Sequence, residues 1–242
     1  MTFPQAIDFH THLGSDIDGI SYTQNQLLNS MKEAHISDAV IFPFHEKDTD
    51  ILQASLNLKA KTQNPNLYPF LRFDPKKTTP KQLASILDGF YGVKLHPSAQ
   101  IFDPLDPVFF PLYEIITQKE KPLLFHTRKE NNPHTDPERI LTLAEQFPKL
   151  ILVIGHFGNA SKSVFEAMKR HPNIYLETSI MGSTPHSIRH AAQHIGTERI
   201  LFGSDAPYSD QLIEKLKIER SQLSTKEIEQ ILYYNAQKLL KI

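Results

Sequence analysis

Two histidines stand one residue apart near the start of the chain, in the segment Ile7-Asp8-Phe9-His10-Thr11-His12. The side chains of a β-strand alternate between its two faces, so His10 and His12 are expected to project to the same side. Imidazole nitrogens are common ligands of zinc and other transition metals. The pair therefore predicts half of a metal site at the end of a buried strand.

Three later apolar runs also end in residues that can bind a metal, namely His126, His156 and Asp205. A buried imidazole or carboxylate costs free energy unless its polar atoms find partners. Each position alone has a plain structural alternative; Asp205, for example, could cap the next helix. Equivalent positions after separate apolar runs favour the joint interpretation, in which all three residues join His10 and His12 in one metal site.

The apolar runs themselves recur along the chain with helical segments between them. Most are continuously apolar, which is typical of parallel strands covered on both faces. Their spacing of about 23 to 33 residues is the length of a βα unit. We expect strands near residues 5–10, 38–44, 67–73, 91–96, 122–126, 150–155, 173–178 and 199–204.

Helix boundaries between these runs carry recognisable signals. A capping residue before a proline opens a helix, and serine followed three residues later by glutamate forms a capping box. Glycine commonly ends a helix. The corresponding residues are Thr79-Pro80, Asp106-Pro107, Asp136-Pro137, Thr184-Pro185, the box Ser224–Glu227 and the stop Gly196.

Eight strands alternating with helices in 242 residues predict an α/β fold, a single (β/α)8 TIM barrel. In a barrel the carboxyl ends of all strands meet on one face, which would bring the five candidate residues together. A doubly wound open sheet is the alternative, but residues 10–15 lack its glycine-rich phosphate turn. Because no linker or charge block divides the chain, residues 1–242 are expected to form one domain.

The fourth expected strand contributes Lys94 and His96, which share one face. A lysine inside a barrel is expensive as a charge, so it needs a role. It could be carboxylated and bridge two metals, hold a substrate carboxylate as a cation, or pair with Glu177. We favour the ion pair or anion binding over carboxylation, and expect His96 to line the pocket.

Other polar residues fall near the same face. Arg128, two residues past His126, could bind an anionic substrate or lie exposed in a loop. The same two alternatives apply to Arg72 at the end of the third strand. Asp8 shares the expected face of His10, and His45 follows the second strand at the rim. We expect the remaining histidines on the surface, in helices or loops: His35, His134, His171, His186, His190 and His194.

Composition limits the partners. A net charge of −1 gives no general attraction to nucleic acid or to an anionic membrane. Without cysteine, any metal must take nitrogen and oxygen donors. Nothing near Met1 resembles a signal peptide, and no apolar run reaches the roughly 18 residues of a membrane span. We expect a cytoplasmic protein with a small-molecule substrate, and homo-oligomer formation stays open.

The segment Ile7–His12 resembles the opening motif of the amidohydrolase superfamily of metal-dependent (β/α)8 barrels. Three further segments are similar to motifs of its amidohydrolase-2 branch, and the closing Asn235–Leu240 is similar to that branch's terminal helix. These segments are Gly92-Val-Lys-Leu-His-Pro97, Gly155-His156-Phe-Gly158 and Phe202-Gly-Ser-Asp205-Ala-Pro207.

The resemblance implies that His10, His12, His126 and Asp205 bind a divalent metal, usually zinc. It also implies that His156 assists catalysis or binds a second metal. Members of the branch include hydrolases of small carbonyl compounds and nonoxidative decarboxylases of unsaturated or aromatic acids. The related TatD-like deoxyribonucleases usually carry a glutamate on strand four, so Lys94 and His96 there count against a nuclease.

Three histidines and one carboxylate suit Zn²⁺, and also Mn²⁺ or Fe²⁺. Zinc lowers the pKa of bound water to about 7. Asp205 would then take the water proton and return it to the leaving group, while His156 would stabilise the developing oxyanion. We expect hydrolysis of an amide, lactone or ester of a small acid. The alternatives are metal-dependent decarboxylation, with Lys94 or Arg128 supplying positive charge, and a non-catalytic metal-binding barrel.

Overall fold

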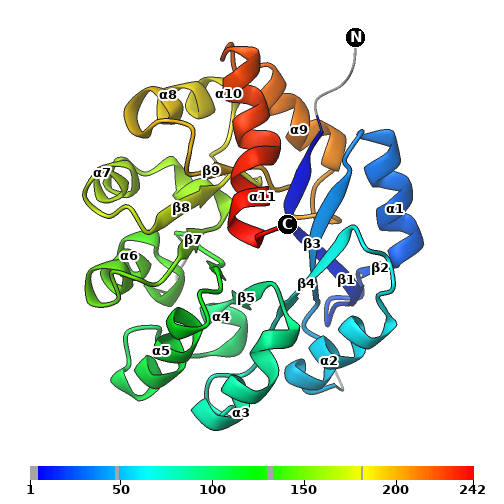
Figure 1. Cartoon of the computed structure of the whole chain (residues 1–242), viewed down its shortest axis with the longest axis vertical. Coiled ribbons are helices and arrows are strands. Elements are labelled where there is room, and N and C mark those ends of the chain that lie inside the picture. Colours follow the sequence, from blue (N-terminus) through cyan, green and yellow to red (C-terminus); the bar gives the residue numbers. More distant parts are fainter. Residues whose placement is uncertain (1–4, 47–48, 130–132, 181) are drawn as a thin grey trace.

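The computed structural model describes residues 5–46, 49–129, 133–180 and 182–242. Its strands form one curled sheet in the order β2-β1-β3-β4-β5-β6-β7-β8-β9, with helices around the outside (Figure 1). Neighbours from β1 onward pair in parallel, and only β2 (Ser21–Tyr22) pairs antiparallel, with the end of β1. The parallel strands are β1 (Ile7–Ser15), β3 (Asp38–Pro43), β4 (Leu67–Leu71), β5 (Gly92–Leu95), β6 (Leu123–Phe125), β7 (Leu152–Ile154), β8 (Ile174–Glu177) and β9 (Ile200–Leu201).

The two ends of this sheet lie next to each other. The Phe9 amide donates to the Phe202 carbonyl at 2.9 Å, the Asp205 amide to the His10 carbonyl at 2.8 Å, and the His12 amide to the Ala206 carbonyl at 2.8 Å. These bonds place the segment that follows β9 beside β1. Residues from the two ends of the chain therefore share one region of the molecule.

Helices connect successive strands, and most predicted boundaries are confirmed. Thr79, Asp136 and Thr184 cap α3, α6 and α8, Ser224 forms its capping box at α10, and Gly196 ends α8. Asp106 caps a 3₁₀ turn, η2 (Pro107–Phe109), that leads into α5. The α-helices are α1 (Gln24–Glu33), α2 (Ile51–Lys61), α3 (Pro80–Ile86), α4 (Pro97–Gln100), α5 (Phe110–Gln118), α6 (Pro137–Gln146), α7 (Lys162–Arg170), α8 (Pro185–Ile195), α9 (Gln211–Glu219), α10 (Thr225–Glu229) and α11 (Asn235–Leu240).

Two apolar clusters hold the fold together. The larger one packs the outer face of the sheet against the helices. The smaller one fills the inside of the curl and takes in Ala236, Leu239 and Leu240 of α11, which lies across the middle of the view in Figure 1. The C-terminal helix thus closes the inner core at the end where the strands begin.

A β-bulge in β1 decides which residues face inward. Ile7 and Phe9 belong to the inner cluster, yet His10 and His12 also contact Phe42 of that cluster, with ring centroids 5.3 and 4.6 Å apart. Strict alternation would turn His10 away from Phe9. The pairing of β1 with β3 shifts register between Asp8 and Thr11, and such a bulge re-aims the side chains that follow it.

Three sequence expectations about the strands need correction. β1 continues to Ser15 instead of ending near residue 10, and its pairing with β2 was not predicted. The remaining strands are shorter than expected, so His96, His126 and Asp205 lie in the segments that follow their strands, and His156 begins the 3₁₀ helix η4 (His156–Ala160). Asp8 does not share the face of His10, because the bulge separates them and Asp8 Oδ2 accepts from Gln211 of α9 at 2.7 Å.

No helix among the described residues is both long and apolar enough to cross a lipid bilayer.

Close packing in β5 can be tested at Gly92. A Cβ at this position would lie 2.5 Å from the ring of Phe70, which is fully buried. We expect Gly92→Ala to lower the free energy of unfolding by about 1 to 3 kcal/mol, because a rigid ring has no room to move. Gly89→Ala is the matched control, since its new methyl meets only the flexible amine end of Lys59. Equal losses for both variants in denaturant titrations would contradict this account.

Candidate metal centre and active site

The carboxylate of Asp205 lies between the two histidines of β1. Its Oδ1 is 2.9 Å from His10 Nε2 and 3.0 Å from His12 Nε2, and all three side chains are buried. Asp205 itself has a left-handed backbone with φ of 60°. Non-glycine residues adopt this conformation only where their surroundings hold them there. The structure thus brings residues from the two ends of the chain together in this trio.

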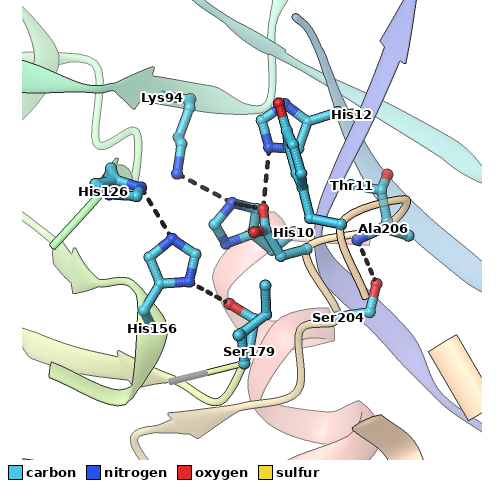
Figure 2. Close-up of polar contacts among 12 residues, drawn as sticks. His10, Thr11, His12, Lys94, His126, His156, Ser179, Ser204 and Ala206 are labelled. Carbon is cyan, nitrogen blue, oxygen red and sulfur yellow. Dashed lines mark hydrogen bonds and ion pairs between the residues drawn. The ribbon is translucent and has the colours of Figure 1, made fainter. Parts of the chain in front are cut away.

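A second pair of imidazoles lies beside the trio. His156 Nε2 is 2.9 Å from His126 Nδ1, and the Ser179 hydroxyl is 2.9 Å from His156 Nδ1 (Figure 2). The rings of His96 and His126 stack with centroids 3.7 Å apart, so His96 packs on this pair as a wall of the site. The His10 and His156 ring centroids are 5.1 Å apart, which joins the two groups.

Glu177, at the end of β8, connects the two groups from below. Its Oε2 lies 2.9 Å from His10 Nδ1 and accepts from the His156 amide at 3.2 Å and the Ser179 hydroxyl at 2.9 Å. The sequence suggests Glu177 only as a partner for Lys94, and it does not single out Ser179. One signal in the sequence could have indicated this role of Glu177. The residue lies near the carboxyl end of the strand predicted for residues 173–178, and the candidate histidines also lie at or just after the carboxyl ends of their strands.

Lys94 reaches the centre from β5. Its Nζ lies 3.1 Å from His10 Nε2 and 5.3 Å from the ring centroid of Phe42. The expected ion pair with Glu177 does not form, since no carboxylate oxygen of the described residues lies within 4.0 Å of this amine. Burial lowers the pKa of Lys94 to about 7.

Burial also determines the charge of the imidazoles. It lowers the pKa of His12 to about 3 and of His156 to about 4, and holds the pKa values of His96 and His126 well below their usual range. A neutral imidazole has a lone pair for a metal. His10 differs: burial and Lys94 act against its protonation, but Asp205 and Glu177 raise its pKa.

Asp205 is the negative counterpart of these rings. Burial alone would raise its pKa, but the neighbouring His10 and His156 and the hydrogen bonds from His10 and His12 hold the pKa of this carboxyl well below its ordinary value. The carboxylate is therefore charged and able to accept a proton or bind a cation.

The donor set fits a divalent metal. Potential ligand atoms of His10, His12 and Asp205 lie within 4.8 Å of one another, and so do those of His10, His156 and Glu177. His12 Nδ1 and His126 Nε2 are buried without a hydrogen-bond partner. Buried nitrogens rarely stay unpaired unless a site supplies a missing partner. His126, predicted as a ligand, belongs to neither group, although its free nitrogen is available.

A cavity of about 440 Å³ opens above the centre. Every predicted site residue except His10 lines it, and so do Arg72 and His45. Residues not anticipated from the sequence complete its wall, including Asp16, Phe44 and Tyr208. Arg128 is exposed at the mouth. Of the histidines expected on the surface, His134 and His171 are half-buried and the others are exposed: His35, His186, His190 and His194.

This centre can be compared with known proteins. The family model for Amidohydrolase, of the amidohydrolase-2 group, matches residues 7–242. The chain belongs to the amidohydrolase-2 family. The sequence resemblance is thereby confirmed over nearly the whole chain, and membership makes the protein a metal-dependent enzyme of the hydrolase or decarboxylase type. No curated protein sequence matches significantly.

Solved structures share the fold. An uncharacterized TIM-barrel protein from Bordetella bronchiseptica superposes with a TM-score of 0.78 at 22% identity, covering 98% of each chain. A dihydroxybenzoic acid decarboxylase from Polaromonas sp., solved with manganese and 2-nitroresorcinol, gives 0.78 at 17%, covering 99% of this chain and 97% of that one. A candidate 2-pyrone-4,6-dicarboxylic acid hydrolase from Pseudomonas putida gives 0.73 at 18%, covering 99% and 98%. At these identities the likeness concerns the fold.

The orienting contacts of Glu177 lead to a prediction about metal affinity. In Glu177→Gln the amide NH₂ would face the backbone and hydroxyl donors that now point at a carboxylate, so His10 would lose its fixed orientation. Losing such a partner typically costs 10–100-fold in metal affinity, and we expect a loss of about that size. Competition with a chelator, followed by elemental analysis, measures it. Glu166→Gln on α7 makes the same change at a solvent-exposed position and should leave affinity unchanged. Equal affinity in both variants would refute the orienting role.

Proposed function

We propose that this protein is a metal-dependent hydrolase that cleaves an amide, lactone or ester of a small acid. The observation that carries the proposal is the Asp205 carboxylate, buried between His10 and His12 on the floor of a cavity of about 440 Å³. A charged carboxylate beside imidazole ligands at the base of a pocket is suited to general base catalysis.

The proposal includes the complete architecture. We take the curled sheet to be a closed (β/α)8 barrel forming one domain over residues 1–242. The hydrogen bonds from β1 to residues 202–206 support closure, as do the TIM-barrel neighbours. The carboxyl ends of the strands would then surround the pocket, as in other enzymes with this fold.

We propose that His10, His12, His126 and Asp205 hold the divalent ion, with zinc as the first candidate. Three nitrogens and one oxygen suit zinc, and manganese is the ion in the Polaromonas neighbour. Such an ion, when bound, polarises a carbonyl and makes water more acidic.

The chain's own groups would move the protons. Asp205, charged and facing the cavity, would accept a proton from the attacking water and return it to the leaving group. His156 is oriented by Ser179 and His126 and faces the same cavity. Its Nε2 would exchange the contact with His126 Nδ1 for the substrate carbonyl oxygen, donate a hydrogen bond to it and stabilise the negative charge that develops there. The apolar walls exclude bulk water, which strengthens these interactions.

Decarboxylation is the second candidate. Three cationic side chains, Lys94, Arg72 and Arg128, line the cavity and would bind an acid substrate beside the metal. The Polaromonas neighbour acts on a dihydroxybenzoic acid, while the Pseudomonas neighbour is a candidate pyrone dicarboxylate hydrolase. A non-catalytic metal-binding barrel is the least favoured, because the chain keeps every residue that the family resemblance implies as a ligand, whereas loss of one of them would be expected of an inactive member: His10, His12, His126 and Asp205.

Isotopic labelling separates the first two functions. The metal-loaded protein would be assayed on small lactones, esters, amides and unsaturated or aromatic acids in H₂¹⁸O. Hydrolysis places ¹⁸O in the acid product, whereas decarboxylation releases CO₂ and leaves the organic product without ¹⁸O from water. We expect label incorporation; CO₂ release from an acid with no label in the organic product would replace the hydrolase by the decarboxylase.

Substitutions in the centre separate metal binding from proton transfer. We expect Asp205→Asn to retain much of the metal while turnover falls about 10²–10⁴-fold, because the general base is lost. His10→Ala should lose the metal itself, since His10 belongs to both potential ligand groups. Elemental analysis and turnover are measured on the same samples, with the surface variant Asp88→Asn as the control. Full activity in metal-stripped protein would end the hydrolase and decarboxylase proposals together.

The expected setting of this activity is also part of the proposal. We take the substrate to be a small molecule, the location to be cytoplasmic, and nucleic acids and membranes not to be partners. Self-association of the chain stays open.

A further inference from the structure

Arg72, just past the end of β4, places a buried cation in the wall of the cavity. The residue is 2% exposed. Its Nη1 donates to the Pro43 carbonyl at 2.7 Å, whereas its Nε is buried without any hydrogen-bond partner. A guanidinium has five donor hydrogens, so most of its bonding capacity is unused.

The backbone of Arg72 is held firmly in place. The Ser55 hydroxyl on α2 accepts from the Arg72 amide at 2.9 Å and donates to the Arg72 carbonyl at 2.8 Å. Together with the Pro43 contact, these bonds fix both the origin and one edge of the side chain. Arg72 is thus preorganised at the cavity wall.

The charge of Arg72 has no close counter-ion. No carboxylate oxygen among the described residues lies within 4.0 Å of its guanidinium. The two nearby acids are engaged elsewhere: Asp16 Oδ2 accepts from the Tyr208 hydroxyl at 2.5 Å, and Asp205 contacts His10 and His12. Burial lowers the pKa of Arg72 to about 10, so the group is still charged near neutral pH.

A fixed, buried and uncompensated guanidinium is destabilising by itself, and a carboxylate matches its planar donors in a bidentate contact. We propose that Arg72 binds a carboxylate of the substrate, so that the natural substrate is a small organic acid anchored at β4 with its reacting group toward Asp205. This inference rests on the proposed function only for the position of the reacting end.

The rest of the cavity suits a flat acid. Phe44 stacks on His12 with ring centroids 4.9 Å apart, and Tyr208 meets both rings edge-on at 5.8 and 5.4 Å. These rings form an apolar aromatic wall. Arg128 is the competing anchor, but it is exposed, and solvent screens the attraction of an exposed charge.

Ligand binding, measured without turnover, tests this assignment. Metal-loaded protein would be titrated calorimetrically with benzoate, phthalate and fumarate, and with their uncharged amides as isosteric probes. We expect Arg72→Gln to weaken carboxylate binding about 10- to 100-fold and to leave amide binding unchanged. Arg72→Lys keeps the positive charge but lacks the planar guanidinium, so its affinity for carboxylates should lie between those of the wild type and Arg72→Gln. Arg170→Gln, which removes the same charge from the end of α7, is the matched control and should bind like the wild type.

The melting temperature distinguishes a ligand-binding role of Arg72 from a structural one. Because Arg72 lacks a counter-ion, Arg72→Met should melt at or above the wild-type temperature, whereas loss of a structural ion pair would lower it. The inference is overturned if the wild type binds none of the carboxylates, if Arg72→Gln binds them as the wild type does, or if only Arg128→Gln loses them. Arg72-dependent binding without turnover would refute the proposed function alone. If the wild type and Arg72→Gln hydrolysed neutral esters at equal rates and neither bound a carboxylate, this inference alone would be refuted.

Discussion

The contact of the Asp205 carboxylate with His10 and His12 is the interaction on which the site depends. It joins the first strand to the segment after the last one, and three backbone hydrogen bonds between the same segments fix its geometry. The sheet must curl fully enough to bring these ends together. Each of the other polar groups, from Glu177 beneath His10 to Lys94 above it, is arranged around this contact. A shift of either segment would separate the Asp205 carboxylate from both imidazoles.

Burying so many charged groups costs free energy of folding unless each charge is compensated by a partner. The carboxylates of Asp205 and Glu177 are compensated by imidazoles and by amide and hydroxyl donors. Lys94 and Arg72 are the less compensated charges, and both line the cavity. Unpaired buried charge destabilises the folded protein and is kept where binding or chemistry uses it. The electrostatic imbalance is therefore concentrated in the wall of the cavity.

Sequence patterns predicted the parts of this site that repeat along the chain. His10, His12, His126, His156 and Asp205 each end or follow an apolar run, so periodicity alone located them. The β-bulge in β1 was not predictable, because it depends on how β1 pairs with β3. This bulge turns Asp8 toward α9 and His10 toward Glu177, so neither contact could be read from strict strand alternation. The β2 pairing and the Phe44 and Tyr208 wall come from loops, whose conformation local sequence does not specify. The sequence leaves the role of Arg72 open, because the lack of a counter-ion beside its guanidinium depends on residues that only the fold brings near it.

The helix that ends the chain, α11, supplies Ala236, Leu239 and Leu240 to the inner core around β1. That core cannot be complete until residues 236–240 have been synthesised and have left the ribosome. During synthesis the early strands therefore expose the apolar side chains that α11 later covers, together with histidines that have no Asp205 partner. Nascent chains of this topology have long-range contacts to form at a late stage, which slows folding and favours aggregation. The docking of α11 thus sets the moment at which the inner core around β1 is closed.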